Sequence, residues 1–359
     1  MVSLASPDST ATVAVVDRRQ RARSLTLWLT LLLGLTSILS LATGAAGTSL
    51  WTVLADLFAG RDLSQMDRVI LFDIRLPRLL LGMLVGSALA VSGAVLQGLF
   101  RNPLADPGIV GVSAGASLGA IMAIVLGGFL PAVFQDLFGR HLVSLAAFLG
   151  GWVTTLLLYR VATQRGQTSV ATMLLAGIAF AALASAISGI LIYRANDAQL
   201  RDLTFWGMGS LAGATWEKVA ASLPIVALAL GVTPFLARAL NALALGEAAA
   251  AHMGVPVQRM KNAAILSVAG ATGAAVAVSG GIGFVGIVVP HLLRLASGPD
   301  HHHLLPNSAL LGASLLLGAD LISRTIIAPA ELPIGIVTAV LGAPVFLWIL
   351  LRRHGALGL

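Results

Sequence analysis

Long apolar stretches recur along this chain from Leu25 to Leu351, and they constrain its fold more than any other feature. A helix needs about 20 mainly apolar residues to cross a bilayer. We expect about ten such spans, near residues 24–45, 79–99, 110–131, 142–162, 169–193, 218–239, 262–280, 283–297, 306–323 and 333–351. Of the 359 residues, 57% are hydrophobic and only 10% are charged, which is too little charge to cover a soluble protein of this length. The sequence therefore predicts an all-α polytopic membrane protein.

The first apolar stretch, residues 24–44, is too long for the apolar region of a secretory signal and lacks a convincing cleavage site. We interpret it as the first span. The expected layout is a cytoplasmic tail over 1–23, a single transmembrane domain over 24–353 and a second tail over 354–359. The chain has no cysteine, which excludes disulfides and cysteine metal sites.

The positive charges indicate how the chain is oriented in the membrane. An even number of spans places both termini on one side, and both ends are basic, in "DRRQRARS" and "LRRH". Because cytoplasmic loops are enriched in Lys and Arg, both termini are predicted to be cytoplasmic. The net charge of +7 is then mainly a topology signal and gives little support to a nucleic-acid partner.

A polar, proline-containing turn, "RNPLADPG" at 101–108, precedes a glycine series in "IVGVSAGASLG". A phosphate-binding P-loop requires a Gly-Lys pair, but the two lysines, Lys218 and Lys261, follow Glu217 and Met260. The glycines recur at intervals of three and four, which favours close packing of membrane helices. The turn is therefore predicted to end the second span on the cytoplasmic side, with the next helix packed tightly against a neighbour.

Two other classes of function fit the sequence poorly. Ion-coupled carriers usually place ionisable side chains at mid-span, whereas here Asp320, towards the outer end of its span, is the only acidic residue that is not in a loop or at a helix end. An intramembrane hydrolase needs a nucleophile and a base, for which Ser185 or Ser188 with His291 are candidates on paper, but serines in apolar helices usually bond to their own backbone. The histidines at 301–303 are more typical of a solvated loop than of a metal site.

The longest cytoplasmic loop, residues 242–262, reads "ALALGEAAAAHMGVPVQRMKN". Its alanines favour a short helix, and Gly254 and Pro256 favour a stop after it. We expect a short helix, a turn and a second short helix across the membrane face. An apolar alanine face at the cytosol predicts a partner protein there.

Five ordered motifs resemble the FecCD family of permeases. They are "IRLPRLLLGMLVGSALAVSGAVLQGLFRNPLADPGIVGVSAG" (74–115), "LGEAAAAHMGVPV" (245–257), "GFVGIVVPHLLR" (283–294), "LLPNSALLGASLLLGAD" (304–320) and "ELPIGIVTAVLGAPVFLW" (331–348). The family contains the membrane subunits of type II ABC importers, which move heme, iron siderophores and vitamin B12. The resemblance runs from about Arg68 to Arg353. It implies a fold like that of vitamin B12 permeases, in the bacterial inner membrane.

The resemblance also implies partners. The subunit would form a homodimer with a translocation path between its copies, together with two ATP-binding cassette ATPase subunits and one periplasmic binding protein. ATP is hydrolysed on the ATPase chains, so the permease is not itself an enzyme and needs no permanently bound cofactor or metal.

Family motifs assign expected roles to individual residues. The resemblance implies that Arg75, Arg78 and Arg324 dock the binding protein and that Asn102 and Leu104 form a cytoplasmic gate. It implies that the ATPase is coupled through Gly246, Glu247, Met253 and Gly254. On a weaker alignment, it implies that the path is lined by Met173, Ser185 and Ser188. Ordinary helix packing is the alternative for Met173.

The expected cargo is heme, because the segment at 196–216 together with 101–115 looks most similar to hemin permeases. Ferric siderophore and cobalamin remain alternatives. Possible iron ligands are seven histidines, Tyr159 and Tyr193, but a carrier that must release its cargo need not ligate iron. Phe205 and Trp206 fit an interfacial aromatic belt as well as cargo stacking.

Overall fold

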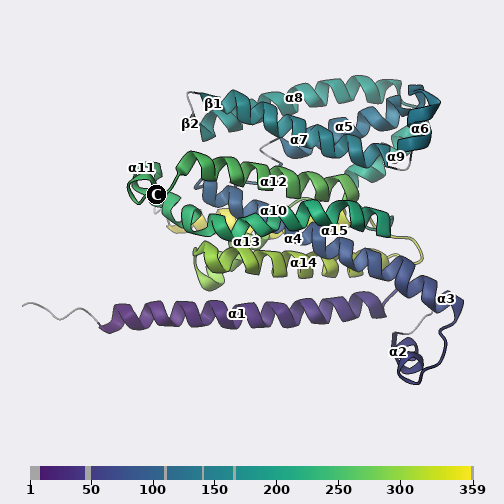
Figure 1. The fold of residues 1–359 in the computed structure, drawn as a ribbon, viewed down its shortest axis with the longest axis horizontal. Coiled ribbons are helices and arrows are strands. Elements are labelled where there is room, and N and C mark those ends of the chain that lie inside the picture. Colours follow the sequence, from purple (N-terminus) through teal and green to yellow (C-terminus); the bar gives the residue numbers. More distant parts are fainter. Residues whose placement is uncertain (1–8, 45–49, 109–110, 140, 165–166, 357–359) are drawn as a thin grey trace, which may run out of the picture.

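The computed structural model describes residues 9–44, 50–108, 111–139, 141–164 and 167–356. The chain is a bundle of long helices that run back and forth along one direction (Figure 1). Eight helical segments in the described part are long and apolar enough to cross a membrane, and the apolar helices Val285–Ser297 and Ile334–Trp348 are shorter. Together they match the ten expected stretches, so the predicted all-α membrane fold is confirmed.

The bounds of the long helices follow the apolar stretches. They are α1 (Ser9–Ala42), α4 (Leu76–Leu99), α5 (Val112–Leu126), α7 (Leu142–Ala162), α8 (Val170–Arg194), α10 (Trp216–Leu243), α12 (Val257–Ser279), α14 (His301–Thr325) and α15 (Ile334–Ala356), with α13 (Val285–Ser297) shorter. Helix α1 begins at Ser9, so the segment assigned to an N-terminal tail is helical from that residue. The first span within it begins at Gln20.

Short elements lie at the two ends of the bundle (Figure 1). At one end are α2 (Leu50–Phe58), α3 (Gln65–Arg68) with the π-helix η1 (Val69–Arg75), the 3-10 helix η2 (Gly127–Phe129), α6 (Ala132–Phe138) and α9 (Asp197–Met208). At the other end are α11 (Glu247–His252) and the two-stranded hairpin of β1 (Thr163–Gln164) and β2 (Gln167–Thr168). Helix α1 starts and α15 ends at this second end (Figure 1), as expected for two cytoplasmic termini.

Two segments differ from the sequence-based expectation. Helix α13 has 13 residues and a length of about 20 Å, so it is shorter than the other spans and than a hydrocarbon core of about 30 Å. Helix α9 was not predicted; it begins with a capping box in which Asn196 and Gln199 each accept a hydrogen bond from the other's backbone amide. Within α9, Phe205 is 55% exposed, whereas Trp206 packs against a small core cluster.

Helix α4 is the centre of the fold and packs against α10, α12, α13 and α14. Its glycines allow backbone contact with two neighbours. A methyl group at Gly86 would overlap the carbonyl oxygen of Gly312 on α14, and one at Gly93 would overlap that of Gly286 on α13. Small residues at helix crossings let backbones approach closely. Close backbone packing against α13 and α14 therefore fixes the position of α4, in addition to apolar burial.

The glycine series after the polar turn serves the same purpose. A methyl group at Gly115 would overlap Gly150 of α7, and one at Gly119 would overlap Ala146 of the same helix. The prediction that this helix packs tightly against a neighbour is confirmed. The prolines also act as expected, because α4 ends at Leu99, before the turn.

Replacing Gly93 by alanine is expected to destabilise the bundle by about 1–3 kcal/mol, because α4 and α13 must separate to admit the methyl group. The yield of monodisperse protein and its thermal unfolding in detergent would measure the effect. Gly34→Ala is the matched control, because nothing lies within 4 Å of the corresponding position on α1. Equal stability of the two variants would contradict this account of α4.

Candidate functional site

The three arginines expected to bind a docking partner come together at the end of the bundle that holds α2 and α9. Arg78 is at the start of α4, Arg75 precedes it, and Arg324 is in the last turn of α14. All three are buried, with 4–6% of their surface exposed. The three arginines that the sequence analysis grouped do lie together, but their burial was not predicted, and their role in docking stays a prediction.

Two carboxylates, the buried Asp320 and the exposed Glu331, neutralise Arg78. Its Nε and Nη2 atoms donate to Oδ1 of Asp320 at 3.0 and 2.9 Å. Its Nη1 and Nη2 atoms donate to the two carboxylate oxygens of Glu331 at 2.8 and 2.9 Å. Such two-pronged pairing suits the planar guanidinium group. Asp320 is 1% exposed, so Arg78 compensates a carboxylate charge that would otherwise be buried without a partner.

The other two arginines connect this cluster to the first span. Arg324 donates from Nη2 to the carbonyl and hydroxyl oxygens of Ser40, both at 2.9 Å, and its Nε lies 3.6 Å from Oδ2 of Asp320. Arg75 donates to the carbonyl oxygen of Leu41 at 2.6 Å. We call Arg75, Arg78, Asp320, Arg324 and Glu331 the outer ion cluster. It joins α1, α4, α14 and the loop before α15.

Next to η1, a polar recess of about 930 Å³ is open to solvent. Its lining residues are Arg61, Asp62, Leu63, Gln65, Arg68, Val69, Phe72, Asp73 and Trp216. Trp216 closes one side by donating from its indole nitrogen to the Phe72 carbonyl at 2.9 Å. The recess holds charges of both signs: the exposed arginines Arg61 and Arg68, which the sequence analysis did not single out, lie beside Asp62 and Asp73, and Arg61 is 3.5 Å from Asp56.

The polar turn between α4 and α5 lies at the opposite end (Figure 1). Asn102 is exposed and Leu104 is partly exposed. The Asn102 side-chain oxygen accepts from the Leu104 amide at 3.0 Å, and Asp106 accepts from the Gly108 amide at 2.8 Å. Burial raises the pKa of the Asp106 carboxyl, which the Gly108 amide partly offsets. These local hydrogen bonds fix the turn, and its role as a gate stays a prediction.

The expected coupling segment forms a compact protrusion at the same end. Gly246 precedes α11 with a φ of +112°, and Gly254 follows it with a φ of +78°, so both positions favour glycine. Met253 is 48% exposed between them. The predicted short helix and turn are confirmed, but no second short helix follows in the described chain. The residues after Pro256 are already the first turn of α12.

A buried lysine fastens this protrusion to the bundle. Lys261 is 3% exposed, and its Nζ donates to Oε1 of Glu247 at 2.7 Å and to the carbonyl oxygen of Thr168 at 3.0 Å. Glu247 is the first residue of α11, and Thr168 is in β2, directly before α8. One ammonium group therefore joins the coupling segment to the entry of α8.

A second side chain of α12, Gln258, also holds Thr168. Gln258 donates from Nε2 to the Thr168 hydroxyl at 2.8 Å and to Asn262 at 2.9 Å, and its Oε1 accepts from the Thr168 amide at 3.2 Å. Tyr159 of α7 closes the network through its hydroxyl, which donates to Asn262. Sequence analysis missed these contacts, although the presence of only two lysines in 359 residues marks Lys261 as unusual.

The candidate path residues of α8 fall into two environments. Ser185 is exposed and Ser188 is partly exposed. Met173, expected to line the path, is instead fully buried in the main hydrophobic core, where it packs rather than presents a surface. Only 11% of the apolar stretch of α8 is buried, compared with 78% for the segment that contains α4. Most of the apolar surface of α8 therefore makes no contact within this chain and is available to lipid or to another subunit.

The histidines at 301–303 do not converge. His301 is buried with its Nδ1 2.7 Å from the side-chain oxygen of Asn241, whereas His302 is exposed. Within the described ranges, no group of three or more His, Cys, Asp or Glu side chains is arranged to hold a metal ion.

The model of the FecCD transport family matches residues 31–352. The chain belongs to the FecCD transport family. It is thus a multi-pass membrane permease subunit of the bacterial ABC importer type, without a catalytic role of its own. The match includes most of the first span, which the motif resemblance did not reach.

Individual relatives of this FecCD permease cover most of its length. It is 48% identical over 284 residues to the hemin transport system permease protein HmuU of Yersinia pestis, covering 79% of this chain and 83% of the relative. It is 42% identical over 342 residues to the vitamin B12 import system permease protein BtuC of Escherichia coli O127:H6, covering 95% and 98%. A solved metal-chelate type ABC transporter in an inward-facing conformation superposes with a TM-score of 0.79 at 32% identity, covering 92% and 99%.

Proposed function

We propose that this FecCD permease forms the translocation path for heme in an ABC importer. The observation that supports heme most directly is the 48% identity to a hemin permease. Ferric siderophore and cobalamin are the alternatives, and the 42% identity to vitamin B12 permeases over 95% of the chain keeps the second open. The importer would take cargo from a periplasmic binding protein and use ATP bound to a separate ATPase, with no cofactor held permanently by this chain.

The path is proposed to lie between two copies of the chain, beside α8. This helix exposes Ser185, Ser188 and a largely unburied apolar surface, which a single subunit in a membrane would present to lipid. Two copies that face each other across α8 would enclose a path with hydroxyl groups on its walls. Asn102 and Leu104 of both copies would narrow its cytoplasmic exit.

The two ends of the bundle are proposed to meet different partners. At the outer end, the binding protein would dock over Arg75, Arg78 and Arg324, where the exposed Arg68 of the neighbouring recess could meet an acidic residue. At the cytoplasmic end, an ATPase subunit would receive α11 with Gly246, Glu247, Met253 and Gly254. The exposed Met253 and Leu245, at 48% and 72%, supply an apolar contact.

Uptake by a reconstituted complex tests the cargo. The chain would be placed in liposomes with its ATPase and binding protein, and uptake of heme, a ferric siderophore and cobalamin would be measured. We expect ATP-dependent uptake of heme at least about tenfold above the other two, a discrimination of about 1.4 kcal/mol. An ATPase variant unable to hydrolyse ATP is the control. Preferred uptake of cobalamin or siderophore would reject heme but retain the importer.

A further inference from the structure

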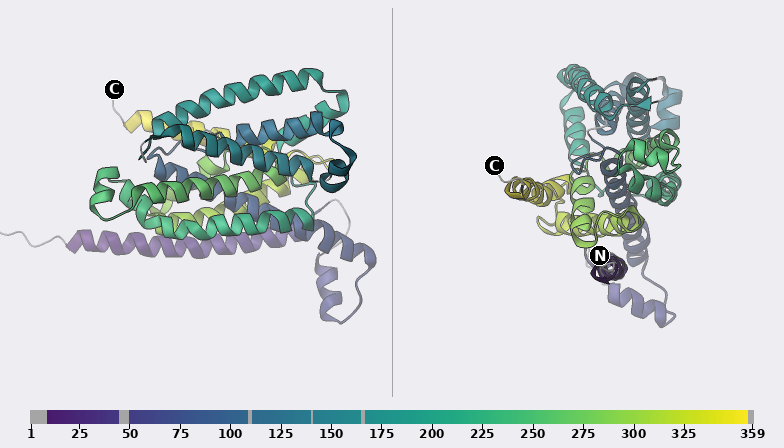
Figure 2. Two further views of the ribbon diagram at one scale, coloured as in Figure 1. Left: turned by 45° about the horizontal axis from the view of Figure 1, so that its top comes forward. Right: turned by 90° about the vertical axis from the view of Figure 1, so that its left-hand side faces the viewer.

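An apolar groove runs along the outside of the bundle between α7, α10 and α12. Its first part is a cavity of about 300 Å³ between these helices and α6. Its second part, of about 470 Å³, continues along the same three helices. The two parts share Phe148 and Ile225, so they form one continuous groove. End-on, the segments from α10 to α12 (green) lie on the side of the bundle opposite α15 (yellow) (Figure 2).

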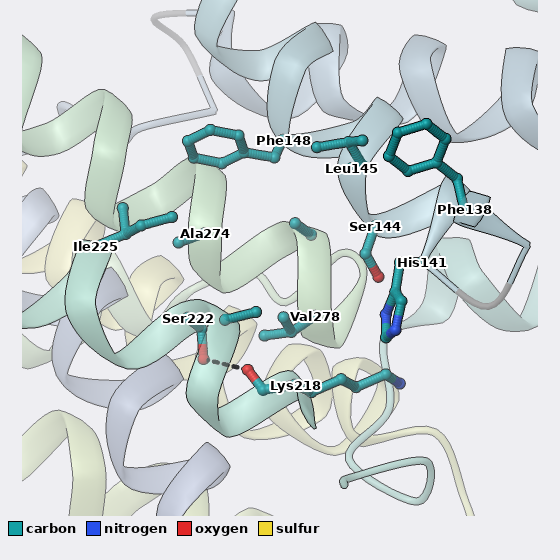
Figure 3. A pocket seen from close by; sticks show the side chains of 12 residues that line it. Phe138, His141, Ser144, Leu145, Phe148, Lys218, Ser222, Ile225, Ala274 and Val278 are labelled. Carbon is teal, nitrogen blue, oxygen red and sulfur yellow. Dashed lines mark hydrogen bonds between the residues drawn. The ribbon is translucent and has the colours of Figure 1, made fainter. Parts of the chain in front are cut away.

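The two parts of the groove differ in polarity. The mouth holds Lys218, His141 and Ser144, which Figure 3 shows at one end of the cavity, whereas Phe148 and Ile225 lie towards the other. Beyond them the lining is almost entirely apolar. Its residues there are Leu149, Trp152, Leu228, Ala229, Val232, Ala263, Leu266, Ser267 and Gly270.

The mouth lies at the depth expected for lipid headgroups. Lys218 is two residues after Trp216, the first residue of a membrane-spanning helix, and tryptophan is enriched at membrane–water interfaces. From Lys218 to Val232 the helix rises about 21 Å, more than the roughly 15 Å of one hydrocarbon leaflet. The groove therefore has the length needed for an acyl chain that enters from the outer side.

The charge at the mouth selects the headgroup. Among the described residues, the Lys218 ammonium group has no hydrogen-bond or ion-pair partner, and no acidic residue lines the cavity. The neighbouring Glu217 lies outside the lining, and its carboxylate is 3.6 Å from Nε2 of His141. Lysine, histidine and serine at the mouth all have donors for a phosphate, and Lys218 is left with an unmatched positive charge.

We propose that this groove is a binding site for an anionic phospholipid of the outer leaflet. The phosphate binds at Lys218, with His141 and Ser144 beside it, and one acyl chain lies along Phe148, Ile225 and the small residues of α12. Gly270 lines the groove without a side chain to fill it, and a Cβ there would lie 3.8 Å from Ile225. The site is independent of the cargo and of the partners proposed above.

Lipid retention by the full-length chain tests this site. The protein would be exchanged into detergent with equal amounts of phosphatidylglycerol and phosphatidylethanolamine, and the lipid bound per chain would be measured by native mass spectrometry. We expect the wild-type chain to retain phosphatidylglycerol preferentially. Lys218→Met should reduce that retention about tenfold, because a charged hydrogen bond to phosphate is lost, and Lys218→Arg should preserve it.

A second variant tests the acyl chain separately from the headgroup. A Cβ at Gly270 would be 3.8 Å from Ile225, so Gly270→Leu fills the groove without displacing backbone. It should reduce retention of both lipids, whereas Gly34→Leu on α1 should not. Equal retention of the two lipids by the wild-type chain, or unchanged retention in Lys218→Met, would overturn the proposal. So would a crosslink between two copies across the groove, because a second copy would then occupy it.

Discussion

Replacement of Lys261 by methionine is expected to uncouple ATP hydrolysis from transport. The methionine can fill the buried space, but it cannot donate to Glu247 or to the Thr168 carbonyl. Loss of these charged hydrogen bonds should cost about 1.5–3 kcal/mol each. Helix α11 would then lose its direct ionic connection to the segment that starts α8. If α8 lines the path, as proposed, movement of α11 would no longer be transmitted fully to it.

The test measures ATP hydrolysis and cargo uptake in the same proteoliposomes. We expect the amount of cargo moved per ATP to fall about tenfold or more, which corresponds to about 1.4 kcal/mol. Lys261→Arg should restore much of the ratio, because arginine keeps the charge and the donors. Arg259→Met is the matched control, since Arg259 is an exposed cation two residues before Lys261 on the same helix. A wild-type ratio in Lys261→Met would show that the lysine serves stability alone.

Asp320→Asn is expected to lower the free energy of unfolding by about 3–5 kcal/mol, because it removes one carboxylate from a cluster that holds three buried arginines. Glu331 alone would then neutralise Arg78, and Arg324 would lose its nearest acidic group. Thermal or denaturant unfolding in a fixed detergent would measure the loss.

Two comparisons make that measurement specific. Asp73→Asn changes an exposed carboxylate at the same end and should leave stability nearly unchanged. In the double variant Arg78→Gln with Asp320→Asn, the two losses should not add, because each substitution removes the same pair. Additive losses would mean that Arg78 and Asp320 contribute independently, contrary to their direct contact.

The helices were predictable from the sequence because hydrocarbon leaves few ways to satisfy a peptide backbone. Apolar length alone located most spans, and the glycine spacing after the polar turn predicted that α5 packs tightly against a neighbour, although not that the neighbour is α7. The expected stretch at 283–297 begins two residues before α13, since composition does not show where a helix starts. It also missed α9, whose signal was the capping pair of Asn196 and Gln199 in a polar segment.

The contacts of the candidate site were less predictable because they join distant parts of the chain. Asp320 lies 242 residues from Arg78, and Glu331 lies 253 residues from it. Motif resemblance grouped the arginines but gave no information on the carboxylates that they bind. The interval of four between Asp320 and Arg324 could have indicated that pair, but the sequence analysis did not use it. Likewise, the hairpin that receives Lys261 is 93 residues away.

The backbone contacts of α4 also limit how this permease can move. Where Gly86 meets Gly312 and Gly93 meets Gly286, there are no side chains whose rearrangement could accommodate a shift between the helices. Such contacts either stay intact or break, so α4, α13 and α14 should behave as one rigid body. Helix α8 is not bound in this way, since most of its apolar surface lies outside the core. We therefore expect the alternation between inward-open and outward-open forms to be a displacement of α8 against a stationary frame.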